Sequence, residues 1–211
     1  GGGHGVVGCD LSELGEGGVA LKGGERLSLT PGTHYAENNH IHHCSRWNPL
    51  YFPGITLDGV GLRASHNLIH DLPHSAIGFT GNDHTIEYNE IHSVVYLAND
   101  AGAIYTFVVN FGPMEELTMY GHLIRHNYVH HMYGYLGKGC NGAVYLDDFF
   151  PGTTIYGNVF HDVPRAAFVG GGRYNVIENN LFIDCAPSVH VDARGLGWAA
   201  GSEEKLIELL Q

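Results

Sequence analysis

Four aspartates in this chain stand where carboxylates can act in pairs. Asp147 and Asp192 each end a short segment of alternating apolar residues, Asp148 follows the first of them, and Asp100 precedes a third such segment. Two carboxylates on opposite sides of a sugar linkage are the acid and base, or the acid and nucleophile, of glycoside hydrolysis. We therefore take Asp100, Asp147, Asp148 and Asp192 as candidate catalytic residues. Asp is also common in turns at strand ends, so a purely structural role is the alternative for each.

The elements that position these acids follow from a repeated phrase, Asn-x-apolar-His. Its leading residues are Asn39, Asn67, Asn89, Asn127 and Asn158, with a last, modified copy at Asn180. Their spacings are 28, 22, 38, 31 and 22 residues. The shortest spacing is the bare period, and the longer ones contain insertions. Self-similarity on this scale predicts a solenoid.

Three apolar positions recur at fixed offsets from the Asn. They hold Ile41, Ile69, Ile91, Val129, Phe160 and Phe182; Ala36, Ala64, Ile86, Ile124, Ile155 and Ile177; and Cys44, Leu72, Val94, Met132, Val163 and Cys185. Apolar columns separated by polar residues are what strands stacked around a shared interior require. The fold class we predict is all-β, a right-handed parallel β-helix, with a short C-terminal helix at 202–210. Cys44 and Cys185 share a column but lie too many turns apart for a disulfide.

A second strand of each turn also aligns. Alternation sends Ile77, Ile104, Val144, Phe168 and Val189 inward, so that Tyr105, Tyr145 and His190 face outward. In this alignment Asp147 and Asp192 lie two turns, or about 10 Å, apart, with Gly171 as a bare floor between them. A gap of ~6.5 to 9.5 Å admits the water of an inverting glycosidase. Asp100 lies ~23 Å from Asp147 in simple register, unless the insertion before it folds back.

Basic and imidazole side chains complete the candidate site. Arg173 and Arg194 align with Phe149, where they either pair with Asp148 or bind a substrate carboxylate bidentately. The His of each repeat stacks one per turn, which favours ring-on-ring packing over a tetrahedral metal cage. We therefore predict no metal and no cofactor.

Composition limits the function. The 211 residues carry a net charge of −12, which argues against nucleic acid or an anionic membrane as partner. The sequence contains neither an apolar run of about 20 residues nor a recognisable signal peptide. Because the chain begins within what resembles a solenoid turn, we expect it to be a fragment of a secreted or periplasmic protein. The predicted parts are a β-helix over 1–198 and a helical segment over 199–211, and we expect a monomer.

Three insertions interrupt the repeat, at 45–54, 107–117 and 134–141. Each contains Gly or Pro, and the first also contains several aromatic residues. Loops that leave a rigid solenoid on one side usually build its binding site.

Several separated motifs resemble bacterial β-helix glycoside hydrolases of family 141. They are Asp100-Ala101-Gly102, Leu146-Asp147-Asp148, Gly81-Asn82-Asp83-His84, Gly170-Gly171-Gly172-Arg173 and His190-Val191-Asp192-Ala193-Arg194. The resemblance implies cleavage of plant cell-wall glycans, with fucosidase-like or xylanase-like activity, and catalytic acids at Asp100 and at Asp147 or Asp148. Relatives continue the first motif with Gly-Arg-Asp-Trp, whereas this chain has Phe107-Val108-Val109-Asn110. An Arg and an Asp expected beside Asp147 are therefore absent, or Glu115 or Glu116 replaces them.

An oligo- or polysaccharide is the expected partner. The candidate substrate-binding residues are His74, Asn82, Asp83, Tyr105, Tyr145, Arg173, His190 and Arg194. Two other functions remain open. One is a polysaccharide lyase, which the low number of basic residues disfavours, and the other is a non-catalytic glycan-binding or structural solenoid.

Overall fold

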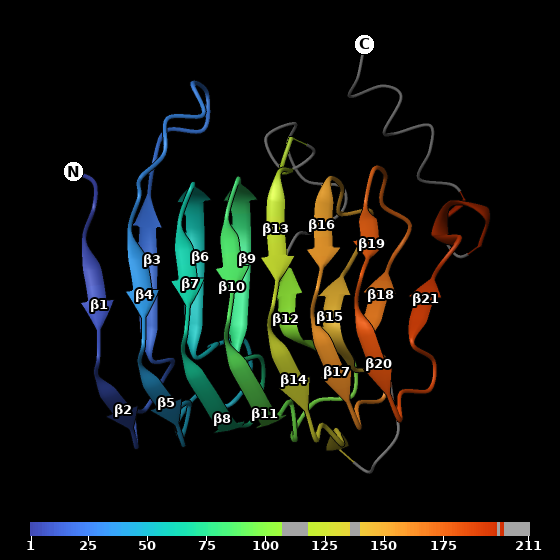
Figure 1. The fold of residues 1–211 in the computed structure, drawn as a ribbon, viewed down its shortest axis with the longest axis horizontal. Helices are drawn as coiled ribbons and strands as arrows, with labels where there is room; N and C mark the ends of the chain where they lie inside the picture. The colour runs from blue at the N-terminus through green and yellow to red at the C-terminus, as the bar shows by residue number, and fades with distance from the viewer. Residues whose placement is uncertain (107–117, 136–139, 198, 201–211) are drawn as a thin grey trace.

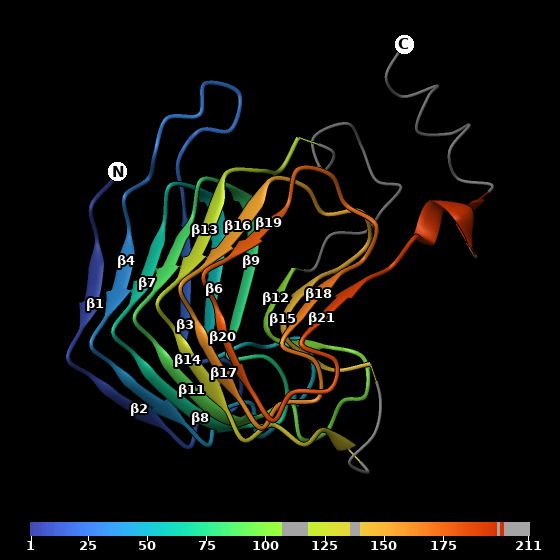
Figure 2. The same cartoon turned by 45° about the vertical axis from the view of Figure 1, so that its right-hand side comes forward.

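The structure is a computed structural model that describes residues 1–106, 118–135, 140–197 and 199–200. The chain coils through three parallel sheets and contributes one strand to each sheet per turn. Figure 1 shows the turns side by side along the long axis of the molecule, and Figure 2 shows the three walls that enclose the interior. The predicted parallel β-helix is confirmed. Two predicted segments, the helix at 202–210 and the insertion at 107–117, lie outside the described residues.

Within these residues each sheet has seven strands. The first contains β1 (Gly5–Val7), β4 (Tyr35–Glu37), β7 (Arg63–Ser65), β10 (Thr85–Glu87), β13 (His122–Arg125), β16 (Thr153–Tyr156) and β19 (Val176–Glu178). The second contains β2 (Asp10–Ser12), β5 (His40–His42), β8 (Leu68–Leu72), β11 (Glu90–Val94), β14 (Tyr128–His130), β17 (Val159–His161) and β20 (Leu181–Ile183). The third contains β3 (Val19–Gly23), β6 (Ile55–Val60), β9 (Ile77–Asn82), β12 (Gly102–Thr106), β15 (Gly142–Leu146), β18 (Ala167–Val169) and β21 (Val189–Val191). A 3₁₀ turn, η2 (Arg194–Leu196), follows β21.

The apolar columns form the core as predicted. Ile41, Ile69, Ile91, Val129 and Phe160 are fully buried, and each lies beside the next in the second sheet. Ile177 and Phe182 are only partly buried, and they pack against the core in the last turn of the first and second sheets. All four cysteines are free.

The repeated Asn residues form one hydrogen-bonded column at the corner between the first and second sheets, here called the Asn column (Asn39, Asn67, Asn89, Asn127, Asn158 and Asn180). The Nδ2 of Asn67 donates to the Oδ1 of Asn89 at 2.9 Å and to the carbonyl of Ala36 at 3.0 Å, and the backbone N–H of Asn67 donates to the same Oδ1. The residue before each of these Asn residues has a positive φ, which turns the chain from one sheet to the next. Cys9 takes the equivalent place in the first turn and donates its N–H to Asn39.

The predicted alignment of the third sheet is correct except in one turn. Ile77, Ile104 and Val144 lie in one inward column, but Ala167, not Phe168, continues it. Phe168 therefore lies beside Tyr145 and His190 on the outer face. The prediction that Phe168 points inward is wrong, because the turn between β15 and β18 is one residue longer than the bare period.

The insertion at 45–54 is a loop between β5 and β6, as predicted, and exposes Trp47 and Tyr51. The insertion at 134–141 is described only at its ends. Within the described residues, no helix has the length and apolar character that a membrane crossing needs.

Candidate active site on the third sheet

Rings line the outer face of the third sheet, one per turn, in what we call the outer column (Tyr105, Tyr145, Phe168 and His190). Neighbouring ring centres are separated by 5.2, 4.4 and 4.7 Å along the column. Alternation along β12, β15, β18 and β21 places these residues outside the coil. The outward direction predicted for Tyr105, Tyr145 and His190 is confirmed. Even so, Tyr105 is only 9% exposed and Tyr145 only 3%.

Two residues further along the same strands, Asp147, Gly170 and Asp192 occupy one position in successive turns. This follows from the pairing of Leu146 with Val169 and of Val169 with Val191. The prediction that Asp147 and Asp192 are equivalent therefore holds, but Gly170 lies between them where Gly171 was expected. The cause is the one-residue shift that also places Phe168 outside.

The space over Gly170 is filled by Arg194. A Cβ atom on Gly170 would lie 2.7 Å from the Arg194 Cζ, so a larger residue there would displace the guanidinium. Arg194 donates from Nη1 to Asp147 Oδ1 at 2.6 Å and from Nε to Asp192 Oδ2 at 3.0 Å, and it also pairs with Asp148. Its guanidinium thus stands between the two carboxylates, where the water of an inverting mechanism was expected. The ion pair predicted between Arg194 and Asp148 is confirmed.

Arg194 stays protonated although its side chain is only 6% exposed. Burial alone lowers the pKa of Arg194, but hydrogen bonds to Asp147 and Asp192 more than offset burial, and the pKa is raised. Its guanidinium also lies 5.5 Å from the ring centre of Phe168, and that of Arg165 lies 5.1 Å from it. Phe168 therefore forms an apolar support for Arg194.

Two tyrosines connect the acids of neighbouring turns. Tyr105, in the turn of Asp100, donates to Asp147 Oδ2 at 2.9 Å, whereas Tyr145, in the turn of Asp147, donates to Asp100 Oδ1 at 2.8 Å. Burial and the nearby carboxylates raise the pKa of both phenols, so both stay protonated and act as donors. Simple register placed Asp100 far from Asp147, but in the structure each acid accepts a hydrogen bond from the tyrosine of the other's turn.

The acid site, as we call Asp100, Tyr105, Tyr145, Asp147, Asp148, Asp192 and Arg194, has an asymmetric charge environment. Asp147 accepts hydrogen bonds from Tyr105, from Arg194 and from the Asp148 N–H, and its side chain is 15% exposed. Asp100 is exposed and accepts from a neutral phenol. Three donors thus hold the Asp147 carboxylate in a fixed position, which suits it to the role of base or nucleophile.

His74 lies beside this site but is buried. Its ring centre is 5.1 Å from that of Tyr51 and 6.2 Å from that of Tyr105, so it links the 45–54 loop to the outer column. Burial lowers the pKa of His74 to about 4, and the ring is neutral at neutral pH. Its Nδ1 lies 3.1 Å from the hydroxyl of Ser75.

The remaining candidate binding residues lie elsewhere. Asn82 is at the far end of β9, where its amide donates to Thr118 and accepts from Arg26. Asp83 follows it in a turn with φ 58°. Arg173 is exposed, and its carbonyl accepts from Gly152. Arg194, not Arg173, is the arginine beside Phe149, so the predicted column of Phe149, Arg173 and Arg194 is not formed.

Sequence reasoning missed Phe168 as a member of the site. The sequence holds one signal for it: Tyr145 and Phe168 are 23 residues apart, one more than the bare period.

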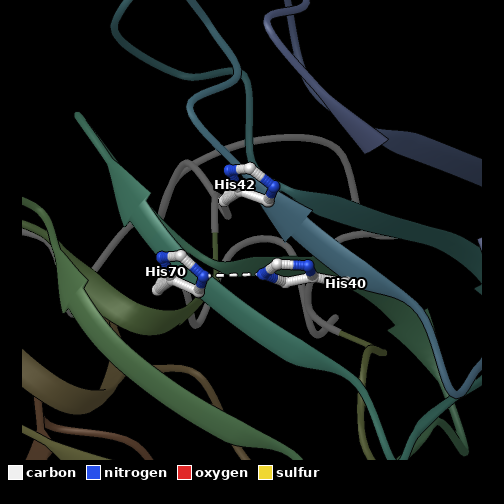
Figure 3. A group of neighbouring side chains, drawn as sticks. All are labelled: His40, His42 and His70. Atoms are coloured by element: carbon white, nitrogen blue, oxygen red, sulfur yellow. Dashed lines mark hydrogen bonds between the residues drawn. The ribbon is translucent and has the colours of Figure 1, made fainter. Parts of the chain in front are cut away.

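Two groups of side chains on the second sheet could hold a metal. They are His40, His42 and His70, and Glu90, His92 and His130. The predicted ring stacking is confirmed from His42 to His130, with centre separations of 5.1 Å from His42 to His70, 4.7 Å from His70 to His92 and 4.9 Å from His92 to His130. His161 instead meets the ring of His131 edge-on at 5.2 Å. His40 joins the row because its ring stacks on that of His42, with the centres 4.2 Å apart. Figure 3 shows His40 beside His70, with His42 next to both.

Comparison with known proteins agrees with the coil. A family profile described as "Right handed beta helix region" matches residues 53–202, which include every residue of the acid site. Neither the curated proteins nor the solved structures include a significant match to this chain.

Proposed function

The chain belongs to the right-handed β-helix family, and from that premise we propose that it is a glycoside hydrolase acting on neutral plant cell-wall-type glycans, with fucosidase-like or xylanase-like activity. One observation carries the proposal: Asp100 and Asp147, from neighbouring turns, each accept a hydrogen bond from the tyrosine of the other's turn, Tyr145 and Tyr105. Two carboxyl groups in different environments are what acid and base chemistry at a glycosidic bond requires.

The two carboxyl groups have distinct roles. Asp147, held by Arg194 and Tyr105, is the partner that activates water or attacks the sugar. Asp100, whose carboxyl group accepts a hydrogen bond from Tyr145, is assigned the transfer of the proton to the leaving oxygen. Asp148 and Asp192 do not take part in the chemistry; both bind Arg194 and so fix its guanidinium against Asp147.

Aromatic side chains provide a binding surface for a chain of sugars. Trp47 is 85% exposed and Tyr51 68% exposed on the 45–54 loop, and Tyr51 leads through His74 to the outer column. The exposed rings of Trp47 and Tyr51 are the surface on which a sugar chain stacks, because Tyr105, Tyr145 and Phe168 of the outer column are buried. The net charge of −12 favours a neutral glycan over an anionic one. We infer a secreted or periplasmic monomer.

Asp147→Asn tests the proposal most directly. The amide keeps the shape of the side chain but cannot act as base or nucleophile, so the release of reducing sugar from xylan or fucosylated oligosaccharides should fall by about 10²–10⁴-fold. The matched control is Asp58→Asn, which changes an outer aspartate of the same sheet that pairs with Lys22, away from the acid site. Activity that survives in Asp147→Asn, or falls equally in both variants, contradicts the proposal.

A second function is favoured by the position of Arg194. Because its guanidinium fills the space between Asp147 and Asp192, these two carboxylates cannot hold a water between them. A non-catalytic glycan-binding β-helix requires no such water. In that case the wild-type protein is retarded on immobilised glycan without releasing sugar, and Trp47→Ala abolishes the retardation. A lyase instead releases an unsaturated product that absorbs in the ultraviolet.

A further inference from the structure

Three histidines gather on the outer face of the second sheet, away from the acid site. His40 and His42 stand on either side of the inward-facing Ile41 in β5, and His70 lies beside His42 in β8. Each offers a ring nitrogen, and these nitrogens lie within 4.8 Å of one another. Figure 3 shows the dashed contact between His40 and His70, whose Nε2 atoms are 2.8 Å apart.

The Nδ1 atoms of His40 and His70 face carboxylates on the side of each ring away from that contact. The Nδ1 of His70 lies 2.7 Å from Asp71 Oδ2, and the Nδ1 of His40 lies 3.5 Å from Asp10 Oδ2. Without an ion, the two Nε2 atoms share a hydrogen bond. An imidazole whose Nδ1 carries the proton presents its Nε2 lone pair, so a metal ion can take the place of that hydrogen bond between the two rings.

A metal ion suits this arrangement in distance and in outer contacts. Zn²⁺–N bonds of ~2.0–2.1 Å at a tetrahedral angle place two nitrogens about 3.3 Å apart, so the Nε2 atoms of His40 and His70 need to separate by only about half an ångström. The contact of His70 with Asp71 is the carboxylate–histidine arrangement that orients metal ligands. Asp10, whose Oδ1 lies 3.2 Å from His42 Nε2, is a nearby oxygen donor for a fourth position.

We propose that His40, His42 and His70 bind a late first-row divalent metal ion such as Zn²⁺, which ties β5 to β8 on the outside of the coil. Imidazole donors select such ions over Ca²⁺ or Mg²⁺, and the net charge of −12 attracts cations in general. The ion bridges successive turns and stabilises the folded coil, because it binds the folded state and not the unfolded chain. The neighbouring group of Glu90, His92 and His130 has one imidazole fewer, and its Glu90 side chain is 53% exposed.

The test is Zn²⁺ binding to the untagged, chelator-treated protein, measured by competition with a chromophoric chelator. We expect one tight equivalent and a higher melting temperature with Zn²⁺. His40→Gln removes a ligand and should weaken this equivalent by more than the ~10–100-fold that follows the loss of an outer partner. Asp71→Asn removes only that partner and should weaken it by ~10–100-fold; Asn suits the φ of 51° at this position.

The matched control is His161→Gln, which removes an imidazole from the same face of the second sheet, outside both metal-binding groups. Its Zn²⁺ affinity should equal that of the wild type. The proposal is overturned if the wild-type protein does not bind Zn²⁺. It is also overturned if folded His40→Gln binds Zn²⁺ with wild-type affinity, because the ion would then be bound by another group of side chains. Circular dichroism reports whether each variant folds, and if His40→Gln does not, wild-type affinity in folded His42→Gln overturns the proposal in the same way.

Discussion

The Asn column and the acid site are both rows of polar side chains along the coil, but only the first repeats one residue type. An Asn amide has a donor and an acceptor, so each Asn donates to the next and accepts from the one before. A carboxylate only accepts. At the position of Asp147 the chain therefore varies from turn to turn, with Lys22, Asp58, Thr80, Asp147, Gly170 and Asp192.

This difference separates residues that maintain the fold from residues available for chemistry. In the Asn column every donor and acceptor is used within the coil, and five of the six Asn residues are 1–2% exposed. In the acid site the carboxylates depend on Tyr105, Tyr145 and Arg194, and side-chain exposure rises from 15% at Asp147 to 33% at Asp192, while Asp100 is exposed. Because carboxylates cannot hydrogen-bond to one another from turn to turn as Asn side chains do, the acid site keeps charged groups at the surface.

Lowering the pH should cause the largest loss of unfolding free energy among these predictions, because it protonates buried histidines and leaves the neutral Asn column unchanged. Burial lowers the pKa of His74 and of His84 to about 4, below the usual 6.5. Between pH 4 and 6.5 the unfolded chain binds more protons at these histidines than the folded protein does. Their contribution to the unfolding free energy is therefore fully present above about pH 6.5 and is lost as the pH drops towards 4. Each group contributes up to about 3 kcal/mol to this loss. Urea unfolding at pH 7.5 and 4.5 measures it; equal stability at both would contradict these burial effects.

Asn89→Asp should break the Asn column at its centre. The Nδ2 of Asn89 donates to the Ala64 carbonyl and to Asn127 Oδ1, so a carboxylate oxygen there would face two acceptors. A buried charge without a partner costs about 3–5 kcal/mol. Asn180→Asp is the matched control at the partly exposed end of the column, where water can reach the new charge, and should cost about 1 kcal/mol. Equal losses of unfolding free energy in the two variants would show that position in the column has no influence.

The same contrast explains how far the sequence predicts the structure. The Asn phrase and its apolar columns identify the coil because each turn repeats the same contacts, so residues such as Ile69 and Asn67 predict their own neighbours. The Asn phrase does not extend to the first turn, because Cys9 stands in the place of an Asn and joins the column through its backbone N–H, which donates to Asn39. The placement of Phe168 escaped the pattern of repeated contacts because one extra residue in a turn reverses which side chains face inward.

The contacts of the acid site were less accessible to sequence reasoning. Alignment brought Asp147 and Asp192 to one position, yet it gave no sign that Arg194 lies between them, because η2 turns the chain back over Gly170. Register also gave no sign that Tyr105 and Tyr145 each bond the acid of the neighbouring turn, because it counts backbone steps and ignores the reach of a tyrosine. Both features depend on long side chains that cross between turns.

Arg194→Gln should give the smallest of the three stability effects and should sharpen the distinction between the two rows. Without the guanidinium, Asp147, Asp148 and Asp192 face one another as like charges. Their partial exposure reduces the cost below that of a buried pair, to about 2 kcal/mol, and 1 M salt should recover part of it by screening. Lys22→Ala, which breaks the exposed pair with Asp58 in the same sheet, is the control and should leave the urea midpoint unchanged. A salt-independent loss in Arg194→Gln would mean that Arg194 acts by packing on Phe168 and not by charge.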